Sequence, residues 1–182
     1  MNRNIRTLLA ASTLIHSGVN LLAPVFAIFL VHINGTLLDT GIAVGIYTIL
    51  KGVFFFLFSK TKEEHLSKKA MMAWGYAIMG GVYLAYMGVQ NVYQLFFLQA
   101  VLSFGESIIT PSWSAALARE LPEGKERDTY AQFYGYRSIF EGGAAIAGGF
   151  FAMQFGFGTL FALMAFCAFA ASTLTARMKN TA

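Results

Sequence analysis

The chain has 182 residues, of which 57% are hydrophobic and only 12% are charged, and its formal net charge is +4. Soluble domains carry about 25% charged residues, so this composition excludes an ordinary soluble domain and predicts an all-α integral membrane protein. The basic residues fall at the ends of apolar segments, so the positive charge does not indicate nucleic-acid binding.

Polar loops divide the chain into six apolar segments, each long enough to cross a bilayer as a helix. We expect transmembrane spans at residues 5–31, 38–58, 70–89, 92–118, 128–155 and 158–176. The loops between them are short, so residues 1–182 form a single six-helix transmembrane domain with no room for a soluble one.

The pattern of polar residues and prolines in spans 1, 2 and 3 resembles the pattern in spans 4, 5 and 6. In chain order they are His16, Asn20 and Pro24 in span 1, Lys51 in span 2, Glu106 and Pro111 in span 4, and Arg137 with Glu141 in span 5. Spans 3 and 6 carry no ionisable group. Because spans 1–3 resemble spans 4–6 and three is odd, the sequence predicts two inverted three-helix repeats, a plan found in secondary transporters.

The fifth span has two distinct sides. Arg137 and Glu141 are four residues apart and share one helix face, which Tyr134 continues. The opposite side carries a glycine at every seventh position, namely Gly135, Gly142, Gly149 and Gly156. Because small residues let a neighbouring helix approach closely, we expect the glycine side to be tightly packed and the polar side to face a cavity.

The distribution of basic residues predicts the orientation. All but two of the 13 Lys and Arg lie before span 1 or after spans 2, 4 and 6, and the two exceptions are Lys51 and Arg137 inside spans. The positive-inside rule therefore places both termini in the cytoplasm of a multi-pass plasma (inner) membrane protein. Lipid headgroups are the expected partners of the basic loop between spans 2 and 3.

A polar stripe on span 4 predicts a cavity. Gln99, Ser103, Glu106, Thr110 and Ser114 follow one another at spacings of four, three, four and four, which is one helix face. With the polar residues of the other spans, this face indicates a water-accessible space bounded by spans 1, 2, 4 and 5. The candidate substrate- or proton-binding residues are Glu106, Arg137, Glu141, His16, Asn20, Lys51, Tyr134 and Ser103.

Each of these residues also has a structural interpretation. Arg137 and Glu141 form either a packing ion pair or a site that binds an anionic group and exchanges a proton. Glu106 either binds and releases a proton or pairs with Lys51 or Arg137. His16, like Asn20, is either functional or a hydrogen-bonded core residue. Lys51 either holds substrate or extends toward the cytoplasm.

The layout resembles one half of a major facilitator superfamily transporter. The phrases GGAAIAGGFF, from Gly142, and GFGTLFALMAF, from Gly156, resemble the fifth and sixth spans of that family. The resemblance implies that spans 1 and 4 line the central cavity, that spans 2 and 5 lie between halves, and that spans 3 and 6 lie outside. Family members normally have twelve spans, so this chain resembles a half-length protein.

A single half would expose Glu106 and Arg137 to lipid. We therefore expect a homodimer with a two-fold axis along the membrane normal, or pairing with a different six-helix half.

These features predict a secondary transporter, a symporter or antiporter, that moves a small solute by alternating access with proton or ion coupling at Glu106 and Glu141. The alternative is a non-transporting membrane module, or a fragment or subunit that pairs with another half. The sequence has no HExxH or GxSxG motif and no Cys/His cluster, so we expect no enzyme, metal site or cofactor. The polar residues inside the spans have both signs of charge, so the sequence does not identify the class of solute.

Overall fold

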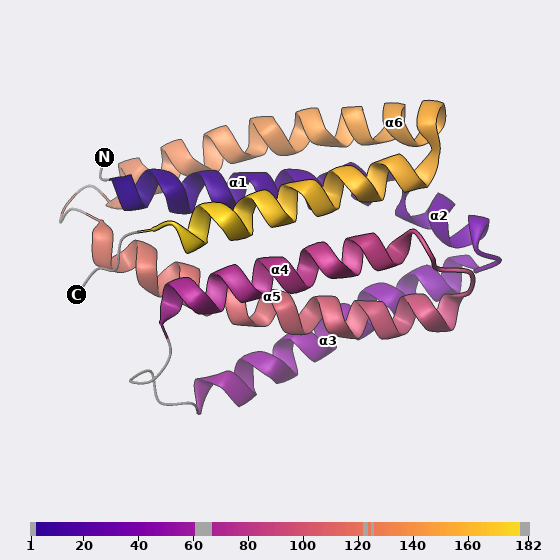
Figure 1. The fold of residues 1–182 in the computed structure, drawn as a ribbon, viewed down its shortest axis with the longest axis horizontal. Coiled ribbons are helices and arrows are strands. Elements are labelled where there is room, and N and C mark those ends of the chain that lie inside the picture. The colour runs from indigo at the N-terminus through magenta and orange to yellow at the C-terminus, as the bar shows by residue number, and fades with distance from the viewer. Residues whose placement is uncertain (1–2, 61–66, 122–123, 125, 179–182) are drawn as a thin grey trace.

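The computed structural model describes residues 3–60, 67–121, 124 and 126–178, and within these ranges the regular structure is entirely helical. In chain order the elements are α1 (Arg3–Leu22), the 3-10 turn η1 (Ala23–Val25), α2 (Phe26–His32), α3 (Leu37–Ser59), α4 (Lys68–Tyr86), α5 (Val92–Glu120) and α6 (Glu126–Ala176). The helices run side by side in one bundle (Figure 1), with the start of α1 and the end of α6 at the same end. We call this the terminal end of the bundle.

Four helical segments are long and apolar enough to cross a membrane: Arg3–His32, Leu37–Ser59, Val92–Arg119 and Glu126–Ala176. The first is interrupted at η1, where Pro24 lies at the start of the turn. Proline has no N–H to donate and its ring crowds the preceding turn, so it breaks the regular hydrogen bonding there. Pro111, in contrast, stays inside α5.

Helix α6 folds back on itself. Its 51 residues would extend about 75 Å as a straight helix, more than twice the hydrocarbon thickness of about 30 Å. Gly156 has φ 76° and ψ 173°, a conformation that suits glycine because it has no Cβ. Figure 1 shows α6 leaving the terminal end and returning to it. We call residues 126–155 the first arm and residues 157–176 the second arm.

The reversal falls between the two segments that the sequence analysis expected as spans, 128–155 and 158–176. The regular helix continues through the region except at one residue, Gly156, and Gly158 is helical. The reason is that a single residue with positive φ is sufficient to reverse the chain, so no separate loop is needed.

Helix α4 is less apolar than the four segments above and is sheltered by protein. Met72, Tyr76, Met79, Tyr83 and Tyr86 are all buried, and the helix packs against α5 and α6. A Cβ at Gly75 would lie only 2.7 Å from the carbonyl oxygen of Gly105, so the α4–α5 crossing depends on glycine.

The glycine side of the fifth span is not packed against another described helix of this chain, contrary to the prediction. A Cβ added at Gly135, Gly142 or Gly149 would meet no described atom within 4 Å, whereas one at Gly148 would overlap the carbonyl oxygen of Leu21 in α1. The first arm therefore turns its polar face toward the protein and its glycine side outward. The physical reason is that ionisable groups within a membrane need partners, whereas glycine can face lipid.

Helix α3 lies at the edge of the bundle. It begins with a capping box, in which the Thr36 side chain accepts a hydrogen bond from the Asp39 N–H and the Asp39 carboxylate accepts one from the Thr36 N–H. It packs chiefly against α5 and touches α2. Ala43 is its one fully buried residue. The opposite flank of α3 is therefore open.

Candidate functional site

Two adjoining cavities lie inside the bundle. The cavity nearer the terminal end, which we call the polar cavity, has a volume of about 350 Å³ and is lined by α1, α3, α4, α5 and the first arm of α6. The second, which we call the apolar cavity, has a volume of about 310 Å³. Val19, Tyr47 and Met79 line both. Each is at the lower end of the range of small-molecule sites, about 300–1,000 Å³.

Polar side chains from four helices and from the first arm of α6 meet in the polar cavity. They are Ser12 and His16 of α1, Tyr47 of α3, Tyr76 of α4, Glu106, Thr110, Trp113 and Ser114 of α5, and Tyr134 and Arg137 of α6. Side chains of both charge signs therefore line one space among apolar helices.

Glu106 is paired with a lysine of the neighbouring helix. The Nζ atom of Lys51 lies 3.4 Å from Oε1 of Glu106 and 3.5 Å from the hydroxyl oxygen of Tyr47. The Lys51 and Glu106 side chains are 24% and 21% exposed, so both are largely withdrawn from the surface. This contact connects α3 to α5, and it is one of the pairings that the sequence had left open.

Arg137 and Glu141 form a tight pair along the first arm of α6. The Nε atom of Arg137 donates to Oε1 of Glu141 at 2.6 Å, and Nδ1 of His16 lies 3.9 Å from the same oxygen. The guanidinium carbon is 5.9 Å from the Phe133 ring centroid and 6.0 Å from that of Tyr134. This hydrogen bond uses the Nε atom of Arg137. The two Nη atoms have no hydrogen-bond partner among the described residues.

The predicted site residues are only partly brought together. Glu106, Arg137, His16 and Tyr134 line the polar cavity. Lys51 and Glu141 contact these lining residues without lining the cavity themselves.

Asn20 and Ser103 lie apart from this group and are not among the residues that line either cavity. The Asn20 side-chain amide donates to the carbonyl of His16 at 2.9 Å. Ser103 is fully buried, and its hydroxyl donates to the carbonyl of Ala100 at 2.7 Å. Both polar groups are satisfied within their own helices, which suits a packing role.

Several lining residues were missed by the sequence reasoning. Tyr76, Met79 and Tyr83 come from α4, whose expected span 70–89 has no charge and was placed outside by the family resemblance. Trp113 lines the polar cavity, and its Nε1–H donates to the carbonyl of Leu8 at 3.1 Å, which joins α5 to α1. A detectable signal was the placement of Tyr76 and Tyr83 seven residues apart, on one helix face.

The apolar cavity has few polar groups. The Tyr86 hydroxyl donates to Oε1 of Gln99 at 3.3 Å. Tyr83 is 1% exposed, and its hydroxyl is one of two buried side-chain polar groups that have no hydrogen-bond partner among the described residues; the other is the Ser17 hydroxyl. Buried polar groups are nearly always satisfied in folded proteins, so the Tyr83 hydroxyl is an exception, and its oxygen is closed off from the cavity that other atoms of Tyr83 line.

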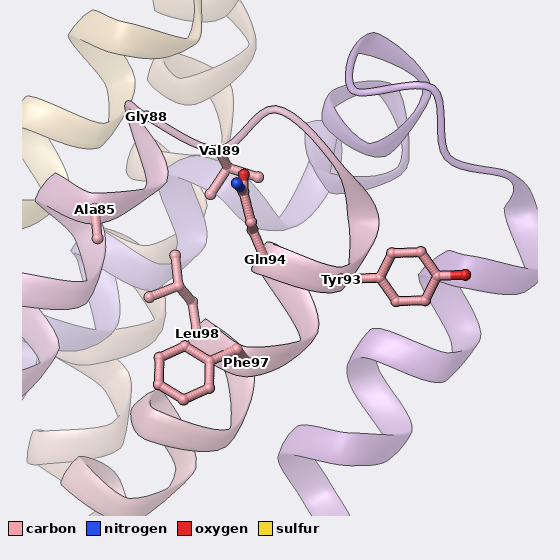
Figure 2. Close-up of a pocket in the computed structure, with 7 residues that line it drawn as sticks. All are labelled: Ala85, Gly88, Val89, Tyr93, Gln94, Phe97 and Leu98. Carbon is pink, nitrogen blue, oxygen red and sulfur yellow. The ribbon is translucent and has the colours of Figure 1, made fainter.

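A separate hollow of about 500 Å³ lies where α4 meets α5, at the end of the bundle opposite the termini. Figure 2 shows its lining side chains, with the Tyr93 ring directed away from the others. Tyr93 is 78% exposed and Phe97 is 68% exposed, and no Asp, Glu, His, Lys or Arg is among the residues that line the hollow. It therefore offers no site for a charged solute. Among the described residues, no three or more His, Cys, Asp or Glu side chains are grouped to hold a metal ion.

The family model of the Major Facilitator Superfamily matches residues 8–180, nearly the whole chain. The search of curated proteins found no match.

Proposed function

Because the chain belongs to the major facilitator superfamily, whose members transport small solutes and are not enzymes, we propose that it is half of a proton- or ion-coupled secondary transporter. It moves a small solute through the plasma (inner) membrane by alternating access. The polar cavity, where Glu106 and Arg137 face one space inside an apolar bundle, is the observation that carries this proposal. Ionisable residues within a membrane commonly mark the paths of solutes and ions.

The proposed chain crosses the membrane six times. The crossings are the α1–α2 segment, α3, α4, α5 and the two arms of α6, and they form two inverted three-helix repeats. Support comes from the reversal at Gly156 and from the burial of α4, which compensates for its modest hydropathy. The positive-inside rule then places both termini in the cytoplasm.

The Lys51–Glu106 pair is the proposed coupling element. Helix α3 packs chiefly against α5, and this pair joins them at 3.4 Å. Protonation of Glu106 removes its charge and with it the attraction to Lys51, so α3 becomes freer to move relative to α5. Glu141, held by Arg137 at 2.6 Å and within 3.9 Å of His16, is the second proposed exchange site.

A second copy is the proposed partner. The open flank of α3 exposes Ile49 and Phe56, and the glycine side of the first arm of α6 exposes Ile139 and Ile146. Helix α3 and the first arm of α6 correspond to spans 2 and 5, which the family resemblance places between the two halves of a transporter. A homodimer with a two-fold axis along the membrane normal would cover both and close the open side of the polar cavity.

Proton flux through reconstituted protein tests the coupling. Liposomes that hold a pH-sensitive dye and the protein are exposed to a panel of amino acids, organic anions and amines, and internal pH is recorded. Glu106→Gln should abolish solute-dependent flux while the protein still inserts. Glu126→Gln, the same change on an exposed carboxylate, should retain it. Flux at the original rate in Glu106→Gln would contradict the proposal.

A non-transporting membrane subunit is the second candidate function. It is favoured by the pairing of both carboxylates, Glu106 with Lys51 and Glu141 with Arg137, because paired charges also serve packing alone. On this alternative, replacing the ionisable residues changes stability and nothing else.

A further inference from the structure

Four charged side chains meet at the polar cavity in two unequal pairs. Glu106 and Arg137 line the cavity, and each pairs with a residue that does not line it, Lys51 for Glu106 and Glu141 for Arg137. The charges therefore balance when Glu106 is ionised and His16 is neutral. The Arg137–Glu141 contact is 2.6 Å long, whereas Lys51 meets Glu106 at 3.4 Å, beyond the range of about 2.7–2.9 Å that is usual for N–H···O bonds between charged groups. The Lys51–Glu106 pair is therefore the weaker of the two.

The unused hydrogen-bonding capacity of Arg137 suits a carboxylate. Its guanidinium uses Nε for Glu141, and its two Nη atoms have no partner in the part of the chain that the structure describes. A guanidinium presents parallel N–H donors that match the two oxygens of a carboxylate. Four apolar side chains also line this cavity, namely Ile15, Val19, Met79 and Ile109. The cavity therefore fits a small molecule with a carboxylate and a short apolar body.

The charge balance decides which state of Glu106 such a molecule requires. A bound carboxylate adds one negative charge to a balanced set, and uncompensated charge in an apolar interior is costly. A proton on Glu106 removes one negative charge and leaves Lys51 without its counter-ion. The set then balances again with the solute anion included. Proton and anion therefore favour each other's binding, and this linkage is reciprocal.

We propose that the solute is a small monocarboxylate with a short apolar body, which the Nη atoms of Arg137 bind while Glu106 takes up one proton from solution. A cationic solute would add to the charges of Lys51 and Arg137. The ammonium of a zwitterion would compete with Lys51 for Glu106. The inference rests on the proposed function in treating the polar cavity as the solute site.

His16 is the competing site for the proton. The titratable groups that line the cavity with Glu106 come from the helices around it: His16 of α1, Tyr47 of α3, Tyr76 of α4 and Tyr134 of α6. Tyrosine hydroxyls ordinarily ionise near about pH 10 and histidine near about pH 6.5. Nδ1 of His16 lies 3.9 Å from Oε1 of Glu141, so a proton on His16 would pair with Glu141 and would not release Lys51. Replacing Glu106 alone therefore separates the two proton sites.

Trp113 provides a reporter of binding. It lines the polar cavity, whereas the other tryptophan, Trp74, is 71% exposed on α4. Trp74→Phe therefore leaves one tryptophan, at the site. Its fluorescence is recorded in nanodiscs between about pH 6 and 8, where simple carboxylic acids stay ionised, while butyrate, butylamine, γ-aminobutyrate or succinate is added. These probes share one chain length and differ in charge.

Butyrate should bind tightest of the four probes. Its affinity should fall as the pH rises, by up to about tenfold per unit, because one proton enters with each anion. Butylamine, γ-aminobutyrate and succinate should bind about tenfold or more weakly, since each leaves charges at the cavity unbalanced or displaces Lys51. Binding of butylamine or γ-aminobutyrate as tight as that of butyrate, or butyrate binding that does not change with pH, overturns the inference.

Two substitutions assign the roles of Glu106 and Arg137. Glu106→Gln keeps the shape of a protonated carboxyl, so butyrate binding should no longer depend on pH. Arg137→Lys keeps the charge that Glu141 needs but loses the parallel donors, so it should weaken butyrate binding about tenfold. Arg119→Lys, the same change on an exposed arginine, should not. Persistent pH dependence in Glu106→Gln, or unchanged affinity in Arg137→Lys, overturns the inference.

Binding and flux together distinguish this inference from the proposed function. Butyrate binding with the expected pH dependence, but without butyrate-driven proton flux, supports the solute class and rejects coupled transport. Flux driven by a different class of solute, with no binding of butyrate, rejects the solute class and leaves the transporter proposal standing.

Discussion

Replacing Gly148 with alanine should push α1 away from the first arm of α6. The added Cβ would overlap the carbonyl oxygen of Leu21 and lie 2.6 Å from its carbonyl carbon and 2.7 Å from its Cα. Carbon atoms in contact need about 3.5 Å, so the helices must separate by at least about 0.9 Å, the difference between that spacing and 2.6 Å, and the closer oxygen demands more. Overpacking of this kind costs about 1–3 kcal/mol.

The next residue is a matched control. A Cβ at Gly149 meets no described atom within 4 Å, and alanine favours a helix over glycine by up to about 1 kcal/mol. Both variants gain this helix preference, so it cancels, and Gly148→Ala should be less stable than Gly149→Ala by about 1–3 kcal/mol, the overpacking cost. Unfolding by denaturing detergent in mixed micelles, followed by circular dichroism, measures the difference. Equal midpoints for the two variants would refute the close approach of α1 and α6.

Three further predictions concern single contacts. Exchanging charges, Lys51→Glu with Glu106→Lys, should recover most of the thermal stability lost in either single variant, and absence of recovery would argue against direct pairing. Trp113→Phe should lower the free energy of unfolding by about 1 kcal/mol, because the hydrogen bond to the Leu8 carbonyl is lost; unchanged detergent unfolding would contradict it. Asn91→Ala should cost about 1 kcal/mol, because Asn91 caps α5; hydrogen exchange at the start of α5 should rise, and unaltered exchange would count against the cap.

Local signals in the sequence were sufficient for most helix boundaries. The expected span 38–58 corresponds to Leu37–Ser59, and 92–118 corresponds to Val92–Glu120, because hydropathy and the capping residues Thr36 and Asn91 act over a few residues. The reversal at Gly156 lies between the expected spans 128–155 and 158–176, although the sequence did not show that a single residue with positive φ makes it.

The candidate site was less predictable because a sequence shows which residues share a face and not what that face meets. The glycine side of the fifth span had the spacing of a packing surface, and only the position of α1 shows that Gly148 is the contact. Ser103 belonged to the polar stripe, yet it is fully buried. Tyr83 has no charge to distinguish it, and its place at the apolar cavity follows from the packing of α4 against α5 and α6.

The Lys51–Glu106 contact has a consequence for biosynthesis, because its partners are 55 residues apart in the chain. At translation rates of about 5–20 residues per second, Lys51 is made roughly 3–11 s before Glu106. During that interval we expect the insertion machinery or lipid headgroups to hold the lysine charge, whereas Arg137 meets Glu141 within its own helix. Ribosome-arrested chains of increasing length should show α3 leaving the translocon only after residue 106 has emerged, and release of α3 from shorter chains would argue against this dependence.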